Sequence, residues 1–320
     1  MFKKVLILGS NSFAGRQCTA YFASQGHEVI GVSRSVLPEP IFFEFDPSFN
    51  LSEFQFHQIN INEDWQKLKQ LLSKHKPAFI IDMAGQGMVA ESWQNPEQWY
   101  QTNILSKVRL HHWLKDCDWL EKYIRVSTPE VYGNTPTAIK ESQPFFPSTP
   151  YAVSHAATDM SLMTYYQQFE FPVVLTRFAN FYGPGQQLYR IVPRTFIYAA
   201  LNKKLSLHGG GTSRRAFIHG LDVAKALSAV MDKGRLGETY HFSTDEVVSI
   251  RDLVVSIAEQ CGISLEQLCE ISDDRPGKDA QYFMDWNKAR TELNWRPEVS
   301  LNTGLVQTGE WVQRHIQPIK

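Results

Sequence analysis

Two short segments of the 320-residue chain carry side chains suited to proton transfer. The first contains Thr128 and Glu130, and the second contains Tyr151 with His155 four positions later. A spacing of four places Tyr151 and His155 on one helix face, one turn apart. A phenol, with an ordinary pKa of about 10, needs a nearby positive charge to act as a base at neutral pH, and an imidazole is mostly uncharged there. The pattern indicates acid–base chemistry, with His155 in a position where catalysis is weakened, shifted in its pH dependence or supported by another cation. The other interpretation of His155 is a packed helix residue.

A glycine-containing loop follows the first apolar run of the chain. The loop reads Gly9-Ser10-Asn11-Ser12-Phe13-Ala14-Gly15 and opens a segment of helical periodicity. Gly9 permits a tight turn, Gly15 permits close helix–sheet approach, and free amides at a helix N-terminus bind phosphate. The loop predicts a dinucleotide site rather than an ordinary turn. Its expected binding residues are Gly9, Asn11, Ser12, Phe13 and Gly15.

The next candidate cofactor residues, Ser33 and Arg34, end the second apolar run. A carboxylate at this place would hold the ribose 2′-hydroxyl of NAD, and none is present. A hydroxyl beside a guanidinium suits a 2′-phosphate, so the pair favours NADP over NAD. The alternative is that Arg34 is a solvated loop residue.

The alternation of apolar and polar residues along the chain predicts the strands and helices that position these residues. Short apolar runs at 4–8, 28–32, 54–58, 79–83, 123–126 and 173–177 alternate with amphipathic segments such as 66–74 and 103–115. This alternation is typical of βαβ units, and it predicts an α/β fold with a doubly wound parallel sheet. Ligands of such sheets bind at the carboxyl ends of the strands.

The second half of the chain has a looser pattern. After Gly183-Pro184-Gly185, short segments mix with predicted helices at 221–233 and 250–260 and at the C-terminus. We expect a dinucleotide-binding domain over residues 1–180 and a smaller α/β lobe, mainly for the substrate, over 181–320. The domain boundary does not exclude a chain that crosses between the two lobes. A ligand cleft is expected between the dinucleotide-binding domain and the smaller lobe.

These motifs resemble those of the extended short-chain dehydrogenase/reductase family, whose members have a Rossmann fold. The similarity is strongest to nucleotide-sugar 4,6-dehydratases, such as those acting on dTDP-glucose and GDP-mannose. It covers nearly the whole chain, including Thr-x-Glu at 128–130, Tyr-x-x-x at 151–154, Asn-x-Tyr-Gly-Pro at 180–184 and Asp-Arg-Pro-Gly at 274–277. The chain departs from the family at Ser12, where a glycine is usual, at Pro129 and at His155, where a lysine is usual.

The resemblance implies a mechanism. Tyr151 removes the C4 hydroxyl proton of a nucleoside-diphosphate hexose with the help of Thr128, and Glu130 then removes the C5 proton so that water leaves from C6. His155 takes the place of the lysine that supports the tyrosine and the cofactor ribose. Pro129 cannot act as the acid that glucose-type members have there, whereas mannose-type members manage without that acid.

The resemblance also implies further contacts. Those with the cofactor involve Asn60, Ile61, Ala84, Gly85, Tyr151 and His155. Those with the sugar nucleotide involve Gln86, Glu91, Ser92, Thr128, Glu130, Asn180, Arg215 and Arg275. Two arginines from separate loops suit a diphosphate, because the guanidinium fork matches phosphate oxygens in pairs.

Two other functions stay open at this stage. One is an epimerase or ketoreductase of the same fold, and the other is a catalytically impaired nucleotide-sugar-binding homologue in which His155 and Pro129 have removed activity. Relatives are commonly dimers built on the helix that carries the tyrosine, so a homodimer is expected.

Composition excludes several other classes of protein. Lys plus Arg (32) nearly balance Asp plus Glu (33), which argues against nucleic acid or an anionic membrane as a partner. The apolar run at 5–8 is too short for a signal peptide or a membrane span. The four cysteines have no metal-ligand spacing, and His111-His112 has no third ligand, so no metal site is expected. We expect a cytoplasmic protein.

Overall fold

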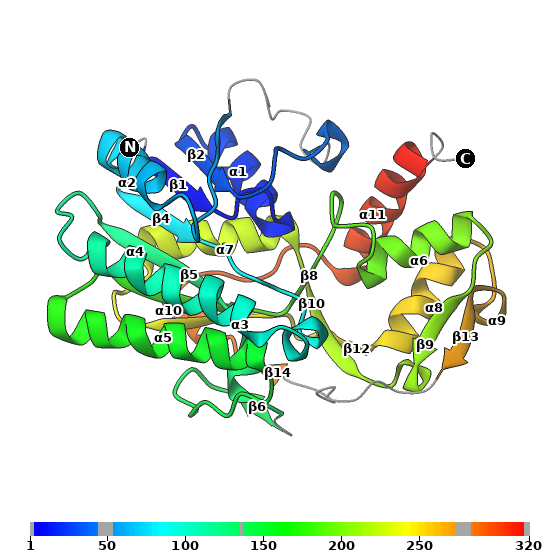
Figure 1. Ribbon diagram of the computed structural model, residues 1–320. Coiled ribbons are helices and arrows are strands. Elements are labelled where there is room, and N and C mark those ends of the chain that lie inside the picture. The colour runs from blue at the N-terminus through cyan, green and yellow to red at the C-terminus, as the bar shows by residue number, and fades with distance from the viewer. Residues whose placement is uncertain (1–2, 44–53, 135–136, 273–282, 317–320) are drawn as a thin grey trace.

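The computed structural model describes residues 3–43, 54–134, 137–272 and 283–316. In this part of the chain, a seven-stranded parallel sheet forms the larger half of the molecule (Figure 1). The strand order is β11-β7-β5-β4-β1-β2-β3. The strands are β1 (Lys4–Leu8), β2 (Glu28–Ser33), β3 (Gln55–Gln58), β4 (Phe79–Asp82), β5 (Lys122–Ser127), β7 (Val173–Phe178) and β11 (Thr239–Phe242). The predicted parallel sheet is confirmed.

The direction of winding reverses at β1. The chain adds β2 and β3 on one side of β1, then crosses to add β4, β5 and β7 on the other. In such sheets the loops after strands on either side of the reversal diverge and leave a crevice at the carboxyl ends. The loops after β1 and β4 flank this crevice.

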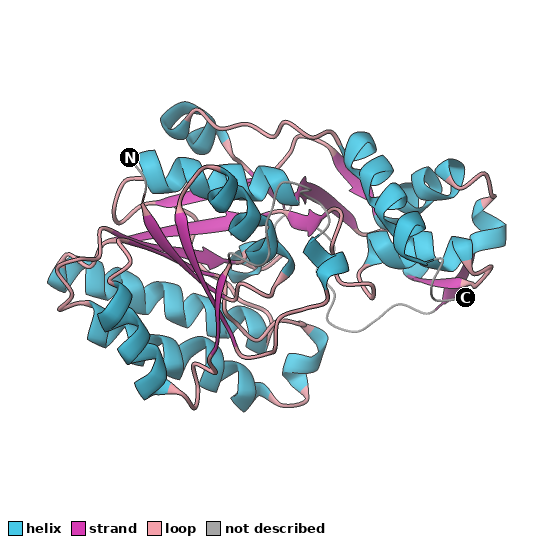
Figure 2. Cartoon of the chain, turned by 90° about the horizontal axis from the view of Figure 1, so that it is seen from above, coloured by secondary structure: helices cyan, strands magenta, loops and turns pink. Residues whose placement is uncertain are grey.

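Helices cover both faces of the sheet (Figure 2). One face packs against α1, α7 and α10, with Phe22, Val230 and Leu293 in the shared core. The other face packs against α2, α4 and α5, with Leu110 and Leu162 in a second core. The bounds are α1 (Phe13–Ser24), α2 (Trp65–His75), α4 (Ser106–Leu114), α5 (Pro150–Phe169), α7 (Gly220–Lys233) and α10 (Asn287–Leu293).

The predicted helix over 103–115 has a different start. A short helix, α3 (Pro96–Trp99), runs into a π-helical segment, Tyr100–Leu105, before α4 begins. The wider π turn places the buried Asn103 side chain against the loop after β4, where its Nδ2 donates to the Gln86 carbonyl at 3.1 Å. A π turn inside a helix is frequent next to functional sites, and amphipathic periodicity does not reveal it.

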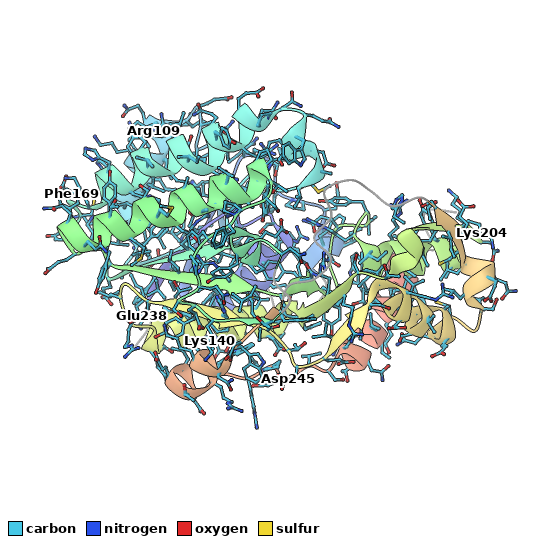
Figure 3. All side chains as sticks on the ribbon, turned by 90° about the horizontal axis from the view of Figure 1, so that it is seen from below. Arg109, Lys140, Phe169, Lys204, Glu238 and Asp245 are labelled. Carbon is cyan, nitrogen blue, oxygen red and sulfur yellow. The ribbon has the colours of Figure 1, made fainter. Side chains whose placement is uncertain are left out.

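The smaller lobe lies beside the carboxyl end of the sheet (Figure 1). Its helices are α6 (Ile191–Ala200), α8 (Ile250–Gln260), α9 (Leu265–Leu268) and α11 (Leu301–Ile316). Its strands are β8 (Asn180–Tyr182), β9 (Leu205–His208), β10 (Arg214–His219), β12 (Val247–Ser249) and β13 (Cys269–Ser272), and a separate pair joins β6 (Ala138–Ile139) to β14 (Phe283–Met284). Figure 3 shows Lys204 at the far end of this lobe from Arg109 and Phe169, which lie on α4 and α5.

The chain crosses between the two lobes more than once. After residue 180 it returns to the large sheet to form α7 and β11. Side chains of α1 also hold the turn that starts the smaller lobe, because Arg16 Nη2 donates to the Gly185 carbonyl at 2.5 Å and Gln17 Nε2 donates to the Pro184 carbonyl at 3.0 Å. In the described ranges, we find no helix with the length and apolar character needed to cross a bilayer.

Candidate active site

The loop after β1 has the shape expected of a phosphate cradle. Gly9 has a φ of +84°, and a Cβ there would lie 2.8 Å from the Ala84 nitrogen. Ser12 begins α1 by accepting a hydrogen bond from the Gly15 amide at 3.0 Å. Among the described residues, the Phe13 and Ala14 amides have no hydrogen-bond acceptor in the protein. Two free N–H groups at a helix N-terminus fit the pyrophosphate of a dinucleotide.

The end of β2 is tied to this loop. The Asn11 amide donates to Ser33 Oγ at 2.9 Å, and Asn11 Nδ2 donates to the carbonyls of Ser35 and Val36 at 3.0 and 2.9 Å. Arg34 is exposed next to this junction, and Gln58 Nε2 fixes its carbonyl at 3.1 Å. Ser33 is therefore fixed to the loop after β1, and Arg34 lies exposed beside it.

The remaining predicted cofactor residues follow β3 and β4 along the same edge of the sheet. The Asn60 amide donates to Asp64 Oδ2 at 2.9 Å, and the buried Ile61 follows it. The Ala84 amide donates to Asp82 Oδ1 at 3.2 Å, and Gly85 is exposed beside it. These residues therefore flank the phosphate cradle on both sides of β1.

The structure brings Tyr151, Thr128 and Glu130 together. Thr128 ends β5 and begins the 3₁₀ turn Pro129–Tyr132, where its Oγ1 accepts from the Glu130 amide at 3.3 Å. Tyr151 lies in the first turn of α5, whose start is capped by Thr149. Burial, and then the Glu130 charge, raise the pKa of Tyr151, while a hydrogen bond with Thr128 lowers it. The arrangement juxtaposes a phenol, a hydroxyl and a carboxylate.

His155 lies one turn further along α5, with its ring centroid 4.6 Å from that of Tyr151. The imidazole is buried, and Arg125 Nη2 lies 3.1 Å from its Nδ1. Burial, and then the Arg125 charge, hold the pKa of His155 well below its usual range. A neutral imidazole therefore stands where a charge would help the phenol to ionise.

The predicted sugar-nucleotide residues come from both lobes. Asn180 and Arg215 lie on adjacent strands of the smaller lobe, because β8 pairs with β10 in the register Asn180 to Phe217. Gln86 is held by its backbone, since its amide donates to Asn103 Oδ1 at 2.7 Å. Glu91 and Ser92 belong to the 3₁₀ turn Ala90–Trp93, in which Ser92 Oγ is buried and donates to the Val89 carbonyl. Arg275 lies outside the described residues.

Comparison with known proteins identifies the family. The family model described as GDP-mannose 4,6 dehydratase matches residues 6–308. The chain belongs to this family. Its fold and motifs are those of the extended short-chain dehydrogenase/reductases that act as epimerases and dehydratases on nucleotide sugars.

Three relatives show the extent of the similarity. The chain is 32% identical over 276 residues to the mouse dTDP-D-glucose 4,6-dehydratase, covering 84% of this chain and 77% of the mouse protein. It is 30% identical over 270 residues to a trifunctional UDP-glucose 4,6-dehydratase of Arabidopsis thaliana, of which it spans only 40%. The dTDP-glucose 4,6-dehydratase of Bacillus anthracis, solved in complex with NAD, superimposes with a TM-score of 0.88 at 25% identity, over 99% of this chain and all of that one. UDP-glucose 4-epimerases share the fold.

Several residues of this dehydratase-family site could not be predicted from the sequence. Asn103 fixes the loop after β4 and also donates to Ser154 Oγ on α5 at 2.9 Å. Arg125 contacts His155 from the sheet, and Arg190, at the start of α6, lowers the pKa of Tyr151. The only sequence signal for Arg125 was a charge inside an otherwise apolar strand. In the described ranges, no three His, Cys, Asp or Glu side chains are placed to hold a metal ion.

Proposed function

We propose that this family member is a nucleotide-sugar 4,6-dehydratase, a lyase that converts a nucleoside-diphosphate hexose into its 4-keto-6-deoxy form. The observation that carries the proposal is the grouping of Tyr151, Thr128 and Glu130 at the carboxyl end of β5. A phenol and a hydroxyl suit removal of the C4 hydroxyl proton. A separate carboxylate suits removal of the C5 proton, which becomes acidic once C4 is a ketone.

The residues also suit a nicotinamide dinucleotide, which when bound accepts the C4 hydride and later returns it to C6. The loop around Gly9 and Gly15 would hold its pyrophosphate. Neighbouring solved structures contain NAD. We favour NADP for this chain, because Ser33 and Arg34 replace a carboxylate at the end of β2.

The lobes divide the binding of the two molecules in this proposal. Residues 1–180 chiefly hold the dinucleotide, and residues 181–320 chiefly hold the sugar nucleotide through Arg215 and Arg275, together with Asn180 at the boundary of the two ranges. We further infer that the protein is a homodimer. We also infer that it works in a reducing compartment such as the cytoplasm, because its four cysteines are free.

The test is incubation of the purified protein with dTDP-glucose, UDP-glucose and GDP-mannose. A dehydratase yields a keto sugar that absorbs in alkali and has lost one water, with no net consumption of cofactor. Retention of the C6 oxygen, or stoichiometric use of NAD(P)H, would instead identify an epimerase or a ketoreductase.

Replacement of Glu130 by Gln separates the steps. Oxidation at C4 should persist and reduced cofactor should accumulate, while formation of the 6-deoxy product falls by roughly 10²–10⁴-fold, the usual effect of a lost general base. Tyr151→Phe should abolish both steps. Glu97→Gln, at an exposed glutamate of α3, is the matched control and should keep full turnover. Equal turnover of the Glu130 variant and the control would contradict the assigned role.

A specific observation favours a second candidate, an impaired homologue that only binds nucleotide sugars. The structure raises the pKa of the Tyr151 phenol and holds His155 neutral, and both effects oppose proton removal. Tight binding of a nucleotide sugar and cofactor without any product would identify this function.

A further inference from the structure

A layer of charged side chains lies under α4 and α5, at the carboxyl end of the large sheet. Alternation along β5 directs Tyr123, Arg125 and Ser127 to this face, and Ile124 packs in the opposite core. Asp82 ends the neighbouring strand in register with Arg125. Arg125 and Asp82 are both buried, in a region where water cannot offset an unpaired charge.

In this layer, Arg125 is the cation with the weakest ionic contacts. Asp82 is bonded to Lys107 and accepts from the Tyr123 hydroxyl at 2.7 Å. Asp159 accepts from Arg177 Nη2 at 2.7 Å and from Ser127 Oγ at 2.6 Å. Arg125 reaches Asp82 only at 3.4 Å and Asp159 only at 3.9 Å.

Three buried cations thus face two buried carboxylates in this layer, among the residues that the structure describes. Since the other two cations have the shorter ion pairs, the surplus positive charge belongs chiefly to Arg125. A surplus buried charge is costly and needs a further acceptor.

His155 provides that acceptor. A guanidinium does not lose its proton in proteins, so Arg125 Nη2 donates across the 3.1 Å contact and His155 Nδ1 accepts. The imidazole proton therefore resides on Nε2, and the ring is neutral. His155 uses only Nδ1 in its hydrogen bonds to the described residues.

We propose that Arg125 and His155 form a positioning pair that replaces the single lysine found in relatives: Arg125 supplies a permanent positive charge, and His155 stands between it and Tyr151 as a neutral Nε2–H donor. The inference rests on the proposed function in that Tyr151 is the base. The Arg125 charge makes the phenolate of Tyr151 more stable, since it lowers the Tyr151 pKa. In the proposal, His155 lies between the two groups, with its ring centroid 4.6 Å from that of Tyr151. The positive charge beside Tyr151 therefore does not depend on the protonation of the side chain at position 155.

The pH dependence of His155 depends on groups from every element packed around it. The charged and titratable groups that face it are Tyr151 and Asp159 on α5, Asp82 on β4, Lys107 on α4, Arg125 on β5 and Arg177 on β7.

Imidazole nitrogen NMR tests the pair without substrate, with His155 assigned from a His155→Gln variant. The wild-type ring should stay neutral and protonated on Nε2 between about pH 6 and 8. In Arg125→Gln, the pKa of His155 should rise toward its ordinary value of about 6.5, but it stays below that value because burial, the larger cause of the low pKa, remains. Arg177→Gln is the matched control, because it removes a buried cation that pairs with Asp159 and acts on His155 only through its charge, without a hydrogen bond to the ring. This variant should keep the Nε2 tautomer. An unchanged tautomer and an unchanged pKa of His155 in Arg125→Gln would overturn the proposal.

Turnover provides a second measurement. It includes the His155→Lys variant, so it tests the pair even where Arg125→Gln folds poorly. His155→Lys alone places an ammonium beside the guanidinium, so turnover should fall by at least about 10-fold, by like-charge repulsion. Arg125→Gln/His155→Lys moves one cation from the sheet to the helix and should recover at least about 10-fold over His155→Lys. Higher turnover of His155→Lys than of wild type would overturn the pair and indicate an impaired site. If wild type shows the predicted NMR behaviour but transforms no nucleotide sugar, the proposed function fails and the Arg125–His155 contact stands.

Discussion

Gly15 is a position at which the absence of a side chain allows α1 to lie close to the loop after β1. A Cβ at this position would lie 2.3 Å from the Gly9 carbonyl oxygen and 2.8 Å from the Ser10 Cα, and both are backbone atoms of the phosphate loop. Backbone cannot swing aside as a flexible side chain can. An added methyl group must therefore push the loop away from α1.

We predict that Gly15→Ala destabilises the protein by about 1–3 kcal/mol, the usual cost of overpacking, and weakens dinucleotide binding at least about 10-fold. Fluorescence titration with NADPH and urea unfolding measure the two effects. Gly87→Ala is the control, since a Cβ there meets nothing within 4 Å. Equal affinities of the two variants would show that the loop does not hold the dinucleotide.

Residues within one short motif could be predicted from the sequence, and residues that act across the fold could not. Thr128, Glu130 and Tyr151 were predicted because the short motifs that contain them resemble the catalytic motifs of the family. The role of Arg125 could not be predicted, because it depends on contacts with Asp82 and His155. These two residues are distant from Arg125 in the chain and come close to it only after the sheet forms. A charge inside an apolar strand is the pattern that could have revealed it.

At the level of elements, the end of β2 is the segment to which we assign the proposed preference for NADP over NAD. Ser33 Oγ is already engaged by the Asn11 amide, so the end of β2 is fixed relative to the phosphate loop. We predict that wild type binds NADPH more tightly than NADH, because Arg34 can pair with a 2′-phosphate.

Ser33→Asp with Arg34→Ala should reverse this preference by at least about 10-fold, since a carboxylate there would accept from the ribose hydroxyls and repel a 2′-phosphate. Competitive titration with the two reduced cofactors measures the ratio. Arg214→Ala, at an exposed arginine of β10, is the control and should leave it unchanged. A wild type that prefers NADH would refute the role given to Arg34.

At the scale of the whole molecule, the parallel sheet could be predicted, because each βα unit is local in the chain. The assembly of the smaller lobe could not, since β10 pairs with β8 and β12, and β13 pairs with β9 some 60 residues earlier. Such pairings leave no periodic signal in a single sequence. The expected contribution of Arg215 depends on one of these pairings.

The two faces of α5 differ in exposure, and this difference is the basis of a prediction about quaternary structure. Tyr151, His155 and Asp159 recur every four residues on the face toward the sheet, whereas Val153 and Met160 are 38% and 61% exposed on the other. Leu105, at the end of the adjoining π segment, is 59% exposed. An apolar stripe on two packed helices is suited to pairing with a second copy of itself.

We predict that wild type is a dimer in sedimentation equilibrium at micromolar concentration, and that Met160→Glu raises the dissociation constant at least about 100-fold, because dimerisation would bury an unpaired carboxylate. Ile271→Glu is the matched control: Ile271 is 70% exposed on β13, in the lobe that lies away from α5, and its variant should remain dimeric (Figure 1). A monomeric wild type, or a dimeric Met160→Glu, would exclude α5 as the interface. Because the inward face of the same helix carries Tyr151 and His155, a monomeric variant should also lose turnover if pairing holds α5 in place, and this loss should be absent in Ile271→Glu.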